Sequence, residues 1–278
     1  MKSPFIYINK VLLMSVWAAL FTACSQIDDE DRLIYVAPAE VNRCVLIEDF
    51  TGQRCVNCPN ATAAITQLQE QYGHDKVIAV AIHSGPFAHR TTMSSPLLPL
   101  GTELGDQYYS HWGIEAQPGV LINRTGGPVY DPSQYASAVN NALQQKSAVD
   151  IGIDMTLTAK NLYVTVHPQS ANSLDARLQV WLTEDNIVDT QYMPDGSVNR
   201  EYVHNHVLRQ SLTADPLGDN IHIDGEGSLY QSYAKYSAEI DDSWKTKDLN
   251  IVAFVYTEND GVLQAFTARI PTEELAEK

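Results

Sequence analysis

The feature that most constrains this fold is a pair of cysteines between an apolar strand pattern and a helix pattern. In the stretch FTGQRCVNCPNATAAITQLQE, residues 50–70, Cys55 and Cys58 are two residues apart. The preceding residues predict a strand over 43–50, and the following ones predict a helix over 60–73. A helix N-terminus stabilises a thiolate, which would make Cys55 the nucleophile and Cys58 the resolving cysteine. The spacing alone also fits a structural disulfide or half of a zinc site.

Residues 41–147 alternate strand and helix patterns. Further strands are predicted over 76–83 and 119–124, and further helices over 102–113 and 132–146, with a long loop at 84–101. A strand, helix and strand in succession predict a crossover unit with parallel pairing. We therefore predict an α/β domain over 41–147.

The pattern changes after residue 147. Seven strand-like runs follow without a helix pattern between them: 149–158, 162–168, 176–184, 202–212, 233–240, 249–257 and 262–270. Such a series is typical of an antiparallel sandwich of immunoglobulin or fibronectin type. The sequence thus predicts a separate all-β sandwich domain over 148–278.

The N-terminal residues indicate export and lipid anchoring. A short apolar core at 11–21 is flanked by Lys2 and Lys10 and ends in FTAC, which predicts a signal peptide over 1–23. The cysteine after it resembles a bacterial lipobox, so we expect Cys24 to carry lipid and hold the protein to a membrane. Residues 24–40 contain the acidic run SQIDDEDR and are interpreted as a tether.

The charge of the chain excludes one class of partner. The sequence has 18 Lys and Arg against 34 Asp and Glu, a net charge of −16, which argues against binding nucleic acid. His204 and His206 could complete a metal site with the cysteines only if the later strands folded over them, so we expect no metal. Cys44, on the first strand, is expected to be a buried and inert thiol.

Three segments in order resemble the thioredoxin superfamily. Asp49 lies six residues before Cys55, the dithiol opens a helix, and HWGIEAQPGVLINR places Pro118 sixty residues after Cys58. The resemblance implies an α/β thioredoxin-like domain in which Asp49 assists proton transfer. It also implies a cis Gln117–Pro118 bond that exposes the backbone of Gln117 to a peptide substrate.

The sequence departs from the thioredoxin pattern beside the cysteines. Arg54 replaces a tryptophan and is expected to favour the thiolate and to contact substrate, while Val56-Asn57 replaces Gly-Pro and Gly119 replaces threonine. Reductase, oxidase and isomerase activities therefore all stay open. No dissociable cofactor is needed, because the electrons reside on sulfur.

More of the chain resembles a narrower group. EDFTGQRCVNCP, QPGVLINR, the lipoprotein signal and the β-rich second half are similar to the outer-membrane-protein-28-related lipoproteins of Bacteroidetes. This resemblance implies an outer-membrane location and a thioredoxin-like domain, and the acidic run after Cys24 resembles a signal for export to the cell surface. The leading functional hypothesis, which comes from the dithiol and its thioredoxin-like surroundings, is thiol-disulfide exchange on envelope proteins. The rival hypothesis is a non-enzymatic adhesin or binding module whose Cys55–Cys58 bridge is structural.

Overall fold

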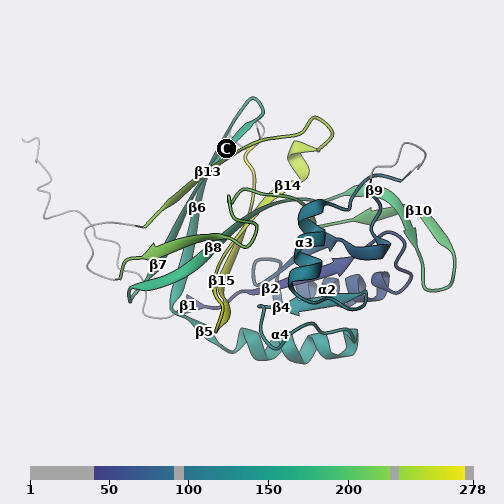
Figure 1. The fold of residues 1–278 in the computed structure, drawn as a ribbon, viewed down its shortest axis with the longest axis horizontal. Coiled ribbons are helices and arrows are strands. Elements are labelled where there is room, and N and C mark those ends of the chain that lie inside the picture. The colour runs from purple at the N-terminus through teal and green to yellow at the C-terminus, as the bar shows by residue number, and fades with distance from the viewer. Residues whose placement is uncertain (1–40, 91–96, 226–231, 273–278) are drawn as a thin grey trace, which may run out of the picture. The chain divides into compact units, whose positions relative to one another are not determined.

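The computed structural model describes residues 41–90, 97–225 and 232–272, which belong to one compact unit (Figure 1). The predicted signal peptide at 1–23, the lipidated Cys24 and the tether at 24–40 lie outside the described residues. Among the helices that the structure describes, we find none with the length and apolar character needed to cross a membrane.

Helices and strands follow one another in an order that differs between the two halves. The first half contains β1 (Val41–Asn42), β2 (Val45–Thr51), α2 (Cys58–Tyr72), β3 (Val77–His83), η2 (Gly85–Phe87), α3 (Glu103–His111), β4 (Gly119–Ile122), η3 (Pro132–Gln134), α4 (Tyr135–Leu143) and β5 (Lys146–Ser147). The second half contains β6 (Val149–Thr158), β7 (Asn161–Ser170), β8 (Leu174–Glu184), β9 (Ile187–Tyr192), β10 (Val198–His204), β11 (Val207–Ser211), β12 (Asp219–Ile223), β13 (Ala234–Glu239), η4 (Thr246–Asp248), β14 (Leu249–Thr257) and β15 (Gly261–Arg269).

The predicted strand–helix–strand unit is confirmed. Strands β2 and β3 pair in parallel from Val45↔Val77 to Thr51↔His83, and α2 connects them. The buried face of α2, formed by Ala61, Ile65 and Leu68, packs on a core that also contains β2 and α4 residues. Apolar residues at helical spacing therefore determine which face of α2 meets the sheet.

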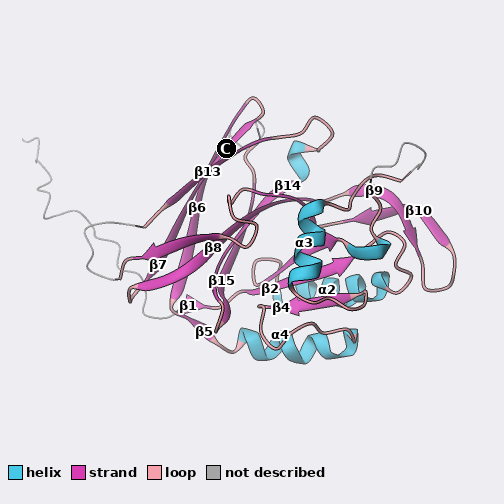
Figure 2. Cartoon of the chain, in the orientation of Figure 1, coloured by secondary structure: helices cyan, strands magenta, loops and turns pink. Residues whose placement is uncertain are grey.

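The largest sheet contradicts the predicted fold class. An α/β thioredoxin-like domain followed by a separate sandwich is wrong, because the chain is mostly strand (Figure 2) and one eight-stranded sheet takes strands from both halves. Its order is β15-β14-β8-β11-β3-β2-β4, with β12 also paired to β8. The halves meet where β11 pairs in parallel with β3 at Val207↔Ala81.

The two halves join in one sheet because β3 has an edge that needs a pairing partner. Without β11, this apolar strand would present an unpaired row of backbone groups on the side away from β2. Pairing with β11 at Val207↔Ala81 covers part of this edge, and the Ala81 amide donates to the His206 carbonyl oxygen at 2.8 Å. Whether residues 41–147 and 148–278 fold independently stays a prediction.

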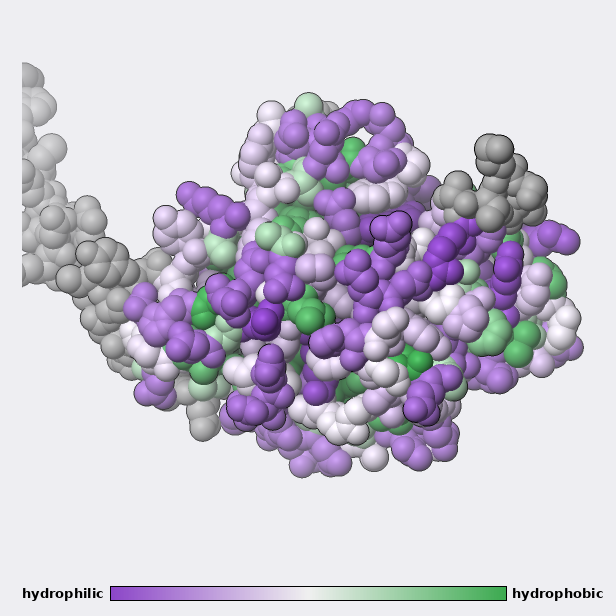
Figure 3. All heavy atoms as spheres, in the orientation of Figure 1, coloured by the Kyte–Doolittle hydropathy of each residue, from purple (hydrophilic) through white to green (hydrophobic). Residues whose placement is uncertain are grey.

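The remaining sheets are smaller. Strands β13-β7-β6 form a three-stranded antiparallel sheet whose apolar residues share a core with β8 and β14. Strands β9 and β10 form a two-stranded hairpin, and β1 pairs with β5. The face of the molecule in Figure 3 is largely hydrophilic, with scattered apolar side chains.

Candidate functional site

A disulfide joins the two cysteines of the motif at the start of α2. The Cys55–Cys58 bridge has a Cα–Cα distance of 5.4 Å, and Cys58 is the first residue of the helix. The predicted placement at a helix N-terminus is therefore confirmed. Cys55 is only 3% exposed and Cys58 only 1% exposed, so neither sulfur lies on an open surface of the protein.

The hairpin β9–β10 lies against the disulfide. Gln191 of β9 donates from Nε2 to the carbonyl oxygens of Cys55, at 2.9 Å, and Gly52, at 3.3 Å. The Tyr192 amide donates to the Gln53 carbonyl oxygen at 2.9 Å. Sequence reasoning missed β9 and hence Gln191, because IVDTQY has neither the length nor the alternation of a clear strand.

Asp49 lies buried on β2, the strand that precedes the dithiol in the sequence, and it lines the same cavity as Cys58. Burial raises the pKa of its carboxyl to about 7, and its Oδ1 has no hydrogen-bond partner. A buried carboxyl without an ion-pair partner disfavours its charged form. The side chain can therefore hold or release a proton near neutral pH.

The residues predicted to shape a substrate edge lie at β4 and its preceding turn. The Gln117–Pro118 bond is cis, as predicted. The Gln117 Nε2 donates to the carbonyl oxygens of Thr51, at 2.9 Å, and Ser84, at 3.0 Å. A side chain at Gly119 would place its Cβ 2.9 Å from the Ala116 carbonyl oxygen. That close approach to backbone explains why a glycine stands at this position.

Arg54 is exposed beside the disulfide. Its Nη2 lies 3.4 Å from Nδ1 of His89, and its backbone amide donates to the Phe87 carbonyl oxygen at 3.1 Å. The guanidinium is thus open to a molecule approaching the surface. Its predicted role in substrate binding stays a prediction.

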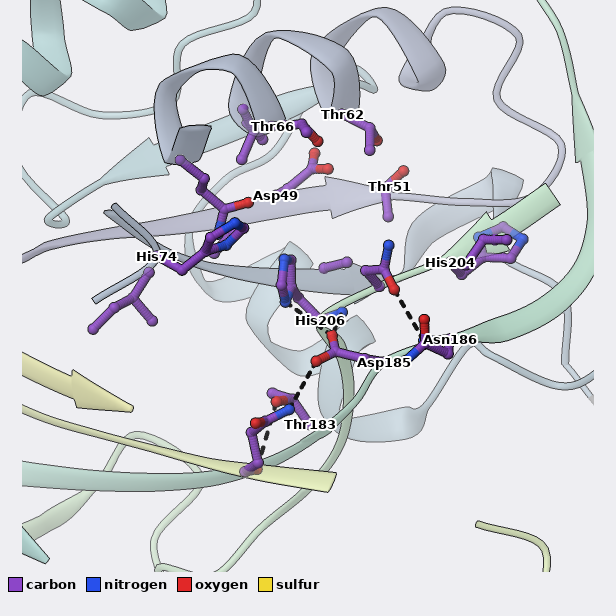
Figure 4. A pocket seen from close by; sticks show the side chains of 18 of the residues that line it. Asp49, Thr51, Thr62, Thr66, His74, Thr183, Asp185, Asn186, His204 and His206 are labelled. Carbon is purple, nitrogen blue, oxygen red and sulfur yellow. Dashed lines mark hydrogen bonds and ion pairs between the residues drawn. The ribbon is translucent and has the colours of Figure 1, made fainter. Parts of the chain in front are cut away.

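A cavity of about 440 Å³ lies beside the disulfide, bounded by α2 and by strands from both halves. Figure 4 shows Asp49, Thr62 and Thr66 on one side of it and His204, His206 and Asp185 on another. Cys58 and Tyr202 also line it. The structure therefore brings Cys58 and Asp49 to one cavity wall, together with residues of the second half that the sequence did not link to them.

Two buried histidines line this cavity. The His83 and His204 rings lie 5.3 Å apart, centroid to centroid. Burial lowers the pKa of His204 to about 4 and that of His83 well below its usual value. Nδ1 of His83 and Nε2 of His204 have no hydrogen-bond partner within the protein. Both rings are therefore neutral at physiological pH.

The later strands do fold over the cysteines, contrary to the expectation used to set His204 and His206 aside. His206 instead pairs with Asp185, its Nδ1 lying 3.0 Å from Oδ1. Among the described residues, no three His, Cys, Asp or Glu side chains converge as a metal site. Cys44 is free and half-buried, and burial raises the pKa of its thiol to about 11, which leaves it unreactive near neutral pH.

Comparisons with known proteins agree with the sequence resemblance at the level of the family. The structure of HBP35 of Porphyromonas gingivalis matches with a TM-score of 0.63 and 17% identity, over 84% of this chain and 77% of that chain, and shows a shared fold. A β-glucosidase from Kluyveromyces marxianus matches at a TM-score of 0.25 and 11% identity, over 45% of this chain and 14% of that chain. That likeness is too low to carry an argument. A comparison with curated proteins gave no match.

The family model described as outer membrane protein Omp28 matches residues 105–274. This region includes Pro118, the hairpin that is hydrogen-bonded to the Cys55 carbonyl and the strands that complete the large sheet. The match thus extends over more than half of the chain, and the chain belongs to the Omp28 outer membrane protein family.

Proposed function

We propose that this protein is a lipid-anchored, non-enzymatic binding protein of the outer membrane in which the Cys55–Cys58 disulfide is a structural crosslink. The observation that carries the proposal is the burial of both cysteines beside a cavity that Cys58 helps to line. A crosslink at this position fixes the first turn of α2, and thereby one wall of the cavity.

Burial bears on the chemistry because thiol-disulfide exchange needs access to sulfur. An external thiolate must reach one sulfur of the bridge, and the released thiolate needs room and polar contacts. Here the hairpin holds the backbone of Cys55 through Gln191. These contacts support a bridge protected from exchange.

The proposal is tested by the reactivity of the disulfide in the folded protein. We expect a Cys44→Ser variant, which keeps only the bridge among the described cysteines, to resist glutathione and to have a reduction potential below about −300 mV. Maleimide labelling after mild reduction should require denaturant. Labelling of Cys55 in the folded protein at glutathione potentials, together with insulin reduction that Cys55→Ser abolishes, would overturn the proposal.

One observation favours a second candidate, thiol-disulfide exchange on envelope proteins. Asp49 lines the same cavity as Cys58 and has a carboxyl with a pKa of about 7, which suits a proton acceptor for a dithiol. In that case the Cys55 thiolate of the reduced protein would attack a disulfide of the substrate, and Cys58 would resolve the mixed disulfide. Arg54, Gln117 and Pro118 would contact the substrate. The labelling experiment decides between the candidates, because exchange requires a bridge that reacts without denaturant.

The lipid anchor is tested separately. We expect the full-length precursor to incorporate labelled palmitate in a bacterial host, and Cys24→Ser to lose the label and to move from the membrane fraction to the soluble envelope fraction. Cys44→Ser is the matched control and should keep both label and location. Membrane retention of an unlabelled Cys24→Ser protein would contradict anchoring at Cys24.

A further inference from the structure

The cavity beside the disulfide has the size of a small-molecule site. Its volume of about 440 Å³ falls within the roughly 300–1,000 Å³ of ligand pockets. It is bounded by β2, α2 and β3 from the first half and by β8, β9, β10, β14 and β15 from the second. A molecule bound there would contact both halves of the large sheet.

Hydroxyl groups form a large part of the polar surface of the cavity. Several lining amides are already engaged: Gln191 with the Cys55 carbonyl, Gln69 with the Val77 carbonyl and Asn250 with Asp185. The hydroxyl-bearing side chains that line the cavity are Thr51, Thr62, Thr66, Thr183, Thr267 and Tyr202. Thr183 and Thr267 already donate to the carbonyl oxygens of Asn250 and Ile251, and Tyr202 is hydrogen-bonded to Thr62. A hydroxyl that donates can still accept, so these oxygens can receive hydrogen bonds from the hydroxyl groups of a ligand.

The buried ionisable groups leave the interior of the cavity nearly neutral. His83 and His204 are uncharged at pH 7, and Asp49 is largely protonated below its pKa of about 7. Asp185 is paired with His206. Arg269 also lines the cavity, but it is exposed to solvent. A charged ligand that reached the buried groups would find no opposite charge among them, which is costly.

Three of these buried residues carry polar atoms without hydrogen-bond partners within the protein. Asp49, His83 and His204 each have one buried polar atom with no hydrogen bond within the protein, and all three line the cavity. Unpaired buried polar atoms are rare in folded proteins and are expected where a ligand or water completes them. Ile65, Ile78 and Val252 add apolar surface to the same wall.

From these observations we infer that the cavity binds a small, neutral, polyhydroxylated molecule of the size of a monosaccharide or disaccharide. The hydroxyl groups of the ligand exchange hydrogen bonds with the threonines and imidazoles, and its C–H faces lie on the apolar side chains. This inference rests on the proposed binding function and specifies the ligand class.

The test uses four probes on the folded protein with its disulfide intact: glucose, maltose, gluconate and glucosamine. We expect saturable binding of glucose or maltose by calorimetry, and at least tenfold weaker binding of anionic gluconate and cationic glucosamine. Preference for a charged probe would overturn the inferred ligand class. Failure of all four probes to bind would overturn the inference as a whole.

Two matched variants locate the binding. Thr66 and Gln67 are both exposed on α2, but only Thr66 lines the cavity. We expect Thr66→Trp to weaken sugar binding at least tenfold and Gln67→Trp to leave it unchanged, with equal melting temperatures confirming the fold of both. Equal effects of the two changes would place the binding elsewhere and overturn the inference. The labelling experiment on the disulfide is independent, so a reactive bridge would contradict only the structural role of the crosslink.

Discussion

At Asp49 the fold holds a carboxyl in surroundings that disfavour its charge. Burial raises its pKa in the folded protein to about 7, whereas an unfolded aspartate has a pKa of about 3.9. The folded state therefore binds more protons than the unfolded state between these values. The contribution of Asp49 to the free energy of unfolding falls as pH rises from about 4 to 7.

We expect Asp49→Asn to remove this dependence. The variant keeps a side chain of similar size that cannot ionise, so its stability relative to wild type should increase from pH 5 to pH 8, by about 1–4 kcal/mol. Urea unfolding at both pH values measures the difference. A difference independent of pH would show that Asp49 has an ordinary pKa in the folded state.

The buried histidines change the stability of the protein with pH in the opposite direction to Asp49. The pKa of His204 is lowered to about 4 in the folded state, below the value of about 6.5 for free histidine. Its neutral form contributes stability above about pH 6.5 that is lost as pH falls toward 4. Comparing Asp49→Asn with wild type at each pH isolates the aspartate, because the histidines are common to both proteins.

At the scale of elements, the hairpin β9–β10 holds the backbone beside the disulfide. The predicted strand over 202–212 is two strands, since the chain turns at His206, where φ is +58°, between β10 and β11. Strand β10 pairs with β9 over the cysteines, while β11 joins the large sheet. An uninterrupted apolar pattern does not reveal such a turn.

We expect Gln191→Ala to loosen the hairpin from the disulfide. The change removes the hydrogen bonds from Nε2 to the Cys55 and Gly52 carbonyls, so reduction of the bridge by dithiothreitol in native buffer should become about 5- to 10-fold faster. Gln169→Ala on β7 is the matched control and should leave the rate unchanged. An unaltered rate for Gln191→Ala would show that the hairpin does not protect the bridge.

Across the whole molecule, one buried ion pair connects the two halves. Arg124, the last residue of QPGVLINR, donates from Nε and Nη2 to the Glu48 carboxylate, each at 2.8 Å. Its guanidinium also lies over the rings of Phe254, at 4.7 Å, and Tyr256, at 4.5 Å, both on β14. The pair thus joins β2 to strands that follow more than a hundred residues later in the sequence.

We expect Arg124→Met to lower the free energy of unfolding by about 3–5 kcal/mol, because it leaves Glu48 buried and unpaired. The double variant Arg124→Met with Glu48→Gln should show a smaller decrease in the free energy of unfolding, because no unpaired charge is then left at position 48. Arg177→Met, which breaks a more exposed pair with Asp215, should cost less than about 1 kcal/mol. Urea denaturation of the four proteins measures these values, and a small loss for Arg124→Met would show that the pair does not hold the halves together.

The sequence by itself determined the local features of this protein. Apolar periodicity predicted β2, α2, β3 and most later strands, and the cysteine motif was placed correctly at the start of α2. The cis Gln117–Pro118 bond was implied by the resemblance to thioredoxins. These features depend on neighbouring residues, whose side chains favour one backbone conformation whatever lies further away.

Only the tertiary structure decided what surrounds them. The pairing of β11 with β3, the hairpin over the disulfide and the cavity that joins Asp49 to His204 bring together residues far apart in sequence. Local patterns specify which side chains will be buried, but several partners can bury the same apolar edge equally well. The choice among them is made by packing of the whole chain, and in this protein it determines whether the sulfurs are reachable.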